Sequence, residues 1–174
     1  KTGTITHGKP VLTDVVVTGA FREEELLRLA GGVEKSSEHQ LAAAIVEGAL
    51  ARGLTLRDPE SFNAIPGHGV EARIEGRMLL LGNLKLMRDR KVPLDGLEAK
   101  AVQLADDGKT PMYVAIEGTP AGLVAVADTV KVDSKEAIHT LKEMGLEVVM
   151  ITGDNERTGK AIARQVGIER VLAE

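Results

Sequence analysis

Cysteine is absent from the 174 residues, and aromatic residues make up only 2% of them. Without cysteine the chain has no disulfide framework, no zinc-thiolate site and no thiol nucleophile. Phe21, Phe62 and Tyr113 are the only aromatic side chains, so a ligand site cannot rely on stacked rings. Long apolar runs are missing too: LAAAIV at 41–46 is far shorter than a membrane-spanning helix. No secretory signal pattern is visible.

An excess of basic residues is also missing. The chain has 22 Lys and Arg against 26 Asp and Glu, a net charge of −4, so a broad nucleic-acid-binding face is not expected. Hydrophobic residues make up 43% and charged residues 28%, which is typical of a folded globular protein. The length suits one ample domain or two small ones.

The segment 11–118 has the pattern of an antiparallel sheet with helices against it, because short strands are joined by hairpins. The predicted elements are a strand at 11–19, a helix at 21–33 that stops at Gly31 and Gly32, a helix at 36–53, two or three strands within 61–82 with a tight turn at Gly76, helices at 83–91 and 94–108, and a hairpin within 110–128 that turns near Gly118.

From about residue 121 the pattern changes. GLVAVAD at 122–128 is a continuous apolar run, as in a strand buried on both faces. A helix at 134–145, a second buried strand at 146–154, a helix at 155–167 and a strand from 168 to Glu174 follow. This alternation predicts a parallel, Rossmann-like sheet, whose chemistry lies at the carboxyl ends of the strands.

Two short motifs carry candidate chemistry. TGDN at 152–155 follows a predicted strand and offers a hydroxyl, a flexible backbone and a carboxylate, as a phosphoryl site requires. A plain loop with Asp154 or Asn155 as a helix N-cap explains it equally well. KTGT at 1–4 offers a lysine to neutralise phosphate charge, although these residues are also common in turns.

The two motifs, together with SSEHQLAAAIV, GHGV and LGN, resemble one family in order and spacing. The chain resembles the catalytic portion of P-type ATPases of the heavy-metal-transporting group. In that family the first motif is Asp-Lys-Thr-Gly-Thr, and its Asp accepts the phosphoryl group of ATP. The resemblance implies that this Asp belongs directly before Lys1. The family's later Gly-Asp-Gly-x-Asn-Asp stretch, which holds magnesium, does not occur in the sequence.

The resemblance implies an α/β and α+β architecture. A nucleotide-binding domain with an antiparallel sheet and flanking helices, 11–118, is inserted in an incomplete Rossmann-like phosphorylation domain of haloacid dehalogenase type, 1–10 and 119–174. The chain as given is expected to bind ATP without hydrolysing it or becoming phosphorylated, because the nucleophile and the magnesium-binding stretch are missing.

In the phosphorylation domain the resemblance implies that Lys1 offsets phosphate charge and that Thr2 offers a backbone oxygen to Mg²⁺. Thr152 and Gly153 would hold the phosphate, and Asp154 would position Mg-ATP. Related phosphatases carry a general-acid Asp two residues after the nucleophile, where this chain has Thr2. Threonine accepts a proton poorly, so an aspartyl phosphate would persist, as transport requires.

The nucleotide site is also carried over from the family, residue by residue. It comprises an acidic residue and a histidine for the adenine, glycines that let the backbone approach the nucleotide, and their neighbours: Glu34, His39, Gly67, Gly69, Val70, Gly82 and Asn83. The glycines also suit ordinary turns. Gln40 stands where the family usually has proline. Ser37 and Gln40 fit a capping box for the following helix.

The sequence therefore predicts an ATP-binding region of an enzyme, a P-type ATPase that transports a heavy-metal cation through an aspartyl phosphate. ITHGKP and the Ser-Glu-His stretch favour copper. ATP and Mg²⁺ are the expected cofactors. Membrane and actuator domains of the parent protein, and a metal ion bound in its membrane helices, are the expected partners, so this region is expected on the cytoplasmic side. Asp128 and Lys131 are expected near the phosphoryl site. The alternatives are a soluble phosphatase of the same superfamily and a non-catalytic nucleotide-binding module.

Overall fold

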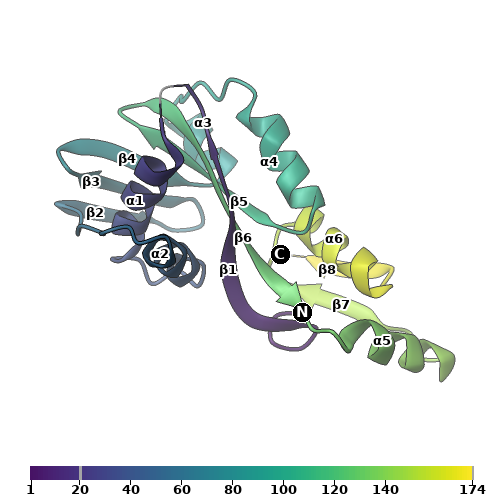
Figure 1. Ribbon diagram of the computed structural model, residues 1–174. Helices are drawn as coiled ribbons and strands as arrows, with labels where there is room; N and C mark the ends of the chain where they lie inside the picture. The colour runs from purple at the N-terminus through teal and green to yellow at the C-terminus, as the bar shows by residue number, and fades with distance from the viewer. Residues whose placement is uncertain (20, 174) are drawn as a thin grey trace. The chain divides into compact units, whose positions relative to one another are not determined.

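The computed structural model describes residues 1–19 and 21–173, so Glu174, the last residue of the final predicted strand, lies outside the described residues. Figure 1 shows the elements in chain order. They are β1 Thr6–Val17, α1 Glu23–Glu34, α2 Ala42–Ala51, β2 Ser61–Ile65, β3 Gly69–Ile74, β4 Arg77–Gly82, α3 Leu84–Asp89, α4 Leu97–Asp106, β5 Thr110–Ile116, β6 Thr119–Val130, α5 Ser134–Glu143, β7 Val149–Thr152, α6 Glu156–Val166 and β8 Arg170–Ala173.

The chain divides into two compact units. Unit 1 contains Lys1–Pro10, Val102–Thr110 and Ala127–Glu174, and unit 2 contains Val11–Ala101 and Pro111–Val126. The predicted domain boundaries, 1–10 with 119–174 and 11–118, differ from these units at 102–110 and 119–126.

Six strands form one sheet in the order β1-β6-β5-β4-β3-β2. The pairs β2–β3, β3–β4 and β4–β5 are antiparallel. Glu75 and Gly76 make the predicted tight turn with φ of 51° and 73°, and Glu117 and Gly118 make the next one with φ of 50° and 74°. The antiparallel sheet with flanking helices is therefore confirmed.

The placement of GLVAVAD in the parallel sheet is wrong. β6 is hydrogen-bonded to β1 and β5, and the parallel sheet within residues 1–19 and 21–173 consists of β7 and β8, with Val149 opposite Arg170. The run is apolar because it is buried within this unit: Val124 and Val126 belong to the same buried cluster as Leu26 of α1, and Leu123 is also fully buried. A continuous apolar strand does not by itself distinguish parallel from antiparallel pairing.

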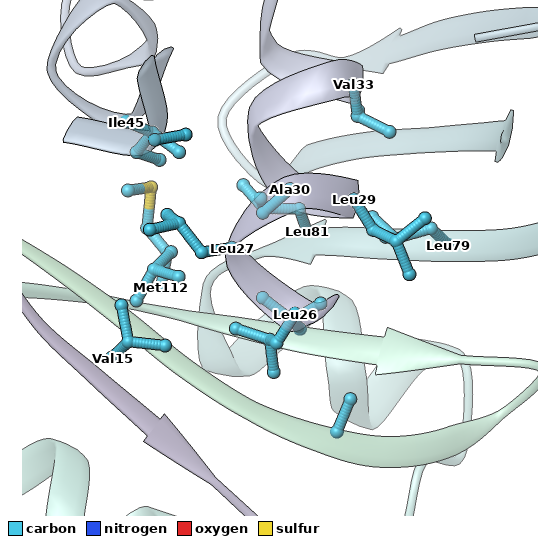
Figure 2. Close-up of a cluster of buried hydrophobic side chains, with 14 of the residues drawn as sticks. Val15, Leu26, Leu27, Leu29, Ala30, Val33, Ile45, Leu79, Leu81 and Met112 are labelled. Atoms are coloured by element: carbon cyan, nitrogen blue, oxygen red, sulfur yellow. The ribbon is translucent and has the colours of Figure 1, made fainter. Parts of the chain in front are cut away.

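Helix α1 supplies the centre of the unit 2 core. Figure 2 shows Leu26, Leu27 and Leu29 of α1 among side chains from the strands and from α2. The predicted stop at Gly31 and Gly32 is wrong, because α1 continues to Glu34. A Cβ atom on Gly32 would lie 2.5 Å from Ile74 Cδ1 and 2.6 Å from the Arg57 carbonyl oxygen. These glycines therefore allow close packing and do not end the helix.

In unit 1 the core is smaller. Ile138 of α5, Met150 of β7 and Ile162 of α6 belong to one buried cluster. Leu141 of the same helix and Met144, its C-cap, are 39% and 70% exposed. The strand β7 ends at Thr152 and α6 begins at Glu156, so the TGDN motif forms the loop at the carboxyl end of a strand of the parallel sheet.

Candidate active site

Lys1 and Asp154 form an ion pair within unit 1. Lys1 Nζ lies 2.7 Å from Asp154 Oδ2, and the two side chains are 4% and 20% exposed. The Thr152 hydroxyl donates to Asp154 Oδ2 and accepts from the Asp154 backbone N–H, both at 3.1 Å. The backbone nitrogen of Lys1 also donates to the Ile151 carbonyl at 2.8 Å. The KTGT and TGDN motifs thus lie side by side, although about 150 residues separate them in the chain.

The local sequence explains the shape of the TGDN loop. Asn155 is the N-cap of α6, since its Oδ1 accepts from the Thr158 N–H at 3.0 Å. Asn155, and not Asp154, is thus the cap, so the Asp154 carboxylate points to Lys1 and Thr152. Nothing lies within 4 Å of a Cβ built on Gly153, so the backbone there is open to a ligand. Thr152 itself is 7% exposed.

The segment 1–8 is held by Asp128, near the end of β6, and by Lys131, which follows β6. Asp128 accepts from the Thr6 hydroxyl at 2.5 Å and from the Gly8 N–H at 2.9 Å. Lys131 Nζ donates to the Gly3 carbonyl at 3.0 Å. Lys131 therefore contacts the KTGT loop, and Asp128 contacts Thr6 and Gly8 just after it. Thr2 and Thr4 of the loop are exposed.

Sequence reasoning missed Thr6 and Ser134. Thr6 is fully buried, and its hydroxyl lies 3.3 Å from the Lys1 carbonyl as well as bonding to Asp128. The Ser134 hydroxyl donates to the Ile5 carbonyl at 2.8 Å. Ser134 belongs to none of the motifs, and Thr6 lies in ITHGKP, which was interpreted only for the choice of metal, so the sequence pattern carries no signal for these contacts.

In unit 2, Asn83 joins the two glycine-containing loops. Its backbone N–H donates to the His68 carbonyl and its Nδ2 donates to the Gly67 carbonyl, both at 2.8 Å. Its Oδ1 accepts from the Leu86 N–H at 3.0 Å and so caps α3. The pairing of Gly69 with Gly82 in the β3–β4 ladder brings the same loops together.

The glycines of these loops have different constraints. Gly67 has φ of +71° and nothing within 4 Å of a Cβ atom, which leaves its surface open. Gly69 has φ of +142°, and a Cβ there would lie 2.5 Å from Gly82 Cα. Val70 next to it is buried. Only glycine fits at position 69, because both the dihedral angle and the neighbouring backbone exclude a side chain.

The predicted capping box at Ser37 and Gln40 is wrong. Helix α2 begins at Ala42, and its N-cap, Leu41, has no side-chain capping bond. The Ser37 hydroxyl accepts instead from the His39 N–H at 3.2 Å, and His39 Nδ1 accepts from the Leu41 N–H at 3.3 Å. Local turns formed by the serine and histidine therefore replace the expected cap.

Glu34 and His39 have contrasting surroundings. His39 is exposed, whereas Glu34 is 4% exposed. Glu34 Oε2 has no hydrogen-bond partner among the described residues. Burial raises the pKa of the Glu34 carboxyl, and the Ser37 hydroxyl beside it partly opposes that rise. In the part of the chain that the structure describes, no hydrogen bond or ion pair joins either residue to the loops at 67–69 and 82–83.

The comparisons with known proteins agree with these motifs. The haloacid dehalogenase-like hydrolase family model matches residues 1–174. The N-domain of HMA8, a copper-transporting P-type ATPase, is 33% identical, with a TM-score of 0.57 over 68% of this chain and 99% of that chain. The chain belongs to the P-type ATPases.

Two further relatives cover this P-type ATPase region from end to end. A copper-exporting P-type ATPase of Bacillus subtilis (strain 168) is 47% identical over 100% of this chain and 22% of its own length. A zinc-transporting PIB-type ATPase, solved in an E2.Pi state, is 35% identical with a TM-score of 0.79, over 99% of this chain and 28% of that chain. The chain spans about a fifth of the length of the curated relatives it matches.

Within residues 1–19 and 21–173, no helix has the length and apolarity needed to cross a membrane. The same residues contain no group of three or more His, Cys, Asp or Glu side chains placed to hold a metal ion.

Proposed function

We propose that this chain is the ATP-binding and phosphoryl-handling region of a P-type ATPase that transports a heavy-metal cation. The observation that carries the proposal is the ion pair between Lys1 and Asp154, supported by the Thr152 hydroxyl. A buried lysine beside a carboxylate and a loop at a strand end can bind a phosphoryl group and its counter-ion. In this proposal the Lys1 ammonium turns toward a phosphoryl oxygen when one arrives.

Unit 2 supplies the proposed nucleotide site. Glu34 accepts from the adenine amino group, and His39 contacts the ring. The open backbone at Gly67 lets the nucleotide approach, while Gly69, Val70, Gly82 and Asn83 fix the shape of the loops. Asn83 supports this role because its three hydrogen bonds hold both loops and the start of α3.

Mg²⁺ fits the proposed phosphoryl site. The ion usually takes one or two protein carboxylates or carbonyls and completes its shell with phosphate oxygens and water. Asp154 supplies a carboxylate that is 20% exposed, and Thr2 lies in an exposed loop where its carbonyl is a second donor. When bound with ATP, the ion would neutralise charge on the phosphates. Gly153, Thr152 and Lys1 would then orient the phosphoryl group.

The parent protein is proposed to be an integral membrane protein with this region on its cytoplasmic side, together with membrane and actuator domains. Copper is the proposed cargo because the full-length relatives that match at 44–47% identity are named copper pumps. We also propose the insertion of domain 11–118 into a phosphorylation domain formed by 1–10 and 119–174. A phosphatase is disfavoured because Thr2 stands where such enzymes need a general acid.

An ATP titration of the chain, followed by calorimetry or by NMR, tests the nucleotide site. His39→Ala should weaken ATP binding several-fold, because loss of one hydrogen bond or ring contact costs about 1 kcal/mol. His139→Ala is the matched control, since His139 lies on α5 with its side chain 73% exposed and belongs to no proposed site. Equal ATP affinity in the parent and both variants would refute the assignment of His39, and no binding to the parent would refute the function.

A further inference from the structure

Thr158 is a polar residue of α6 with only 1% of its surface exposed. Its hydroxyl donates to the Lys109 carbonyl at 2.8 Å and accepts from Asn155 Nδ2 at 3.0 Å. Its backbone N–H donates to Asn155 Oδ1 at 3.0 Å. The hydroxyl therefore links two segments of unit 1, and one of its partners, Lys109, is 49 residues from Thr158 in sequence. A buried hydroxyl with both partners satisfied holds its neighbours in one arrangement.

The first linked segment is 106–110, which we name the connector. It begins at the last residue of α4, and it ends where the chain leaves unit 1 for the unit 2 segment that begins at Pro111. Arg157 Nη1 lies 3.4 Å from Asp106 Oδ1. Gly108 has φ of +83°, and a Cβ on it would lie 3.0 Å from Ile162 Cδ1. The first turns of α6 therefore contact the connector through Thr158 and Arg157 and leave little room for a side chain at Gly108.

The second linked segment is the loop 152–155. Asn155 ends that loop and caps α6. An asparagine cap needs only its Oδ1, which leaves Nδ2 without an assigned partner. Here the Thr158 oxygen accepts from Nδ2, so Thr158 determines the orientation of the whole Asn155 side chain. Asp154, which precedes Asn155, carries the carboxylate paired with Lys1.

We propose that Thr158 is a positioning residue that couples the connector to the loop 152–155. When the connector moves, the hydrogen bond from the Thr158 hydroxyl to Lys109 moves Thr158 with it. The hydrogen bond between Thr158 and Asn155 then shifts Asn155, and with it the neighbouring Asp154. The proposal rests on the proposed function only in treating this loop as the phosphoryl-binding loop. The coupling itself can be measured without nucleotide.

A double-mutant cycle read by NMR tests the coupling. Gly108→Ala perturbs the connector, with Asp106→Ala as a gentler second perturbation. The reporters are hydrogen exchange at the Gly153 and Asp154 amides and the side-chain amide signals of Asn155. With Thr158 or Thr158→Ser, the perturbation should change the signals and raise exchange in the loop roughly fivefold. With Thr158→Val the same perturbation should leave the loop signals and exchange rates unchanged.

Two further variants keep the test decisive. Asn155→Asp retains the N-cap oxygen, but the second carboxylate oxygen accepts the Thr158 hydroxyl proton in place of the Lys109 carbonyl. This variant should therefore uncouple the loop from the connector without unfolding the chain. It provides the test even if Thr158→Val does not fold. Ile162→Val loosens packing against Gly108 while retaining the hydroxyl, and should keep the coupling.

The proposal is overturned if Gly108→Ala still changes the loop signals and exchange equally in Thr158→Val and in Asn155→Asp. It is also overturned if Gly108→Ala leaves the loop of the parent unchanged. Loss of coupling in those two variants, with rescue by Thr158→Ser, would support it. Failure of ATP to bind the parent would refute the proposed function and leave this result standing.

Discussion

The two candidate sites are built by different means. In unit 1, charged and hydroxyl side chains join segments far apart in the chain, as in the contacts of Lys1 with Asp154 and of Thr6 with Asp128. In unit 2, backbone geometry makes the site: Gly69 and Gly82 pair closely, and Asn83 binds the carbonyl oxygens of the neighbouring loop. Unit 1 should therefore be sensitive to loss of charge, and unit 2 to the addition of a single methyl group.

The largest effect is expected for Gly69→Ala in unit 2. The backbone angle of +142° and the Cβ contact at 2.5 Å with Gly82 Cα leave no room for a methyl group. Strain and overpacking together should lower the free energy of unfolding by roughly 4 kcal/mol. Urea denaturation followed by circular dichroism measures the change. A loss below 1 kcal/mol would mean that the β3–β4 backbone adapts easily.

In unit 1, Asp154→Asn should cost less. The substitution leaves the Lys1 ammonium, 4% exposed, without its partner. Breaking a fully buried pair costs about 3–5 kcal/mol, and the 20% exposure of Asp154 reduces this to roughly 2 kcal/mol. Thermal melts at low and high salt can measure it. Asp106→Asn, which changes an exposed ion pair, is the control and should shift stability by less than about 0.5 kcal/mol.

Glu34→Gln should stabilise unit 2 at neutral pH by about 1–2 kcal/mol. The folded-state pKa of Glu34 is raised above 4.5 by burial, so the folded chain holds this proton more tightly than the unfolded chain. Stability from this group is therefore complete below about pH 4.5 and is lost as the pH rises through the folded-state pKa. The parent and Glu34→Gln should have equal stability in acid and diverge upward in pH. Parallel curves at all pH values would contradict the proton linkage.

The smallest effect is expected for Gly67→Ala, which is also the matched control for Gly69→Ala. Its φ of +71° strains an alanine, but nothing lies within 4 Å of the added methyl group. The free energy of unfolding should fall by about 1 kcal/mol. Chemical denaturation of the two glycine variants side by side compares them. A loss as large as that of Gly69→Ala would show that backbone angle, and not close contact, limits both positions.

The sequence by itself determined much of the local structure. Strand and turn signals placed the hairpins at Gly76 and Gly118, because left-handed turns need residues that tolerate positive φ. Motif order indicated the P-type ATPase family, and TGDN was expected at a strand end. The turns and the strand end depend on residues close together in the chain, whose conformational preferences are strong, and the family resemblance needs only the order of the motifs.

Tertiary structure decided what depends on distant partners. Gly31 and Gly32 lie within α1 because Leu56 and Ile74 pack against them. Strand β6 joins the six-stranded sheet because it is hydrogen-bonded to β1 and to β5. The links through Thr6, Ser134 and Thr158 use common residues at no fixed spacing. Only the folded chain decides such contacts, since each depends on burying a polar group beside a partner that many residues separate from it in sequence.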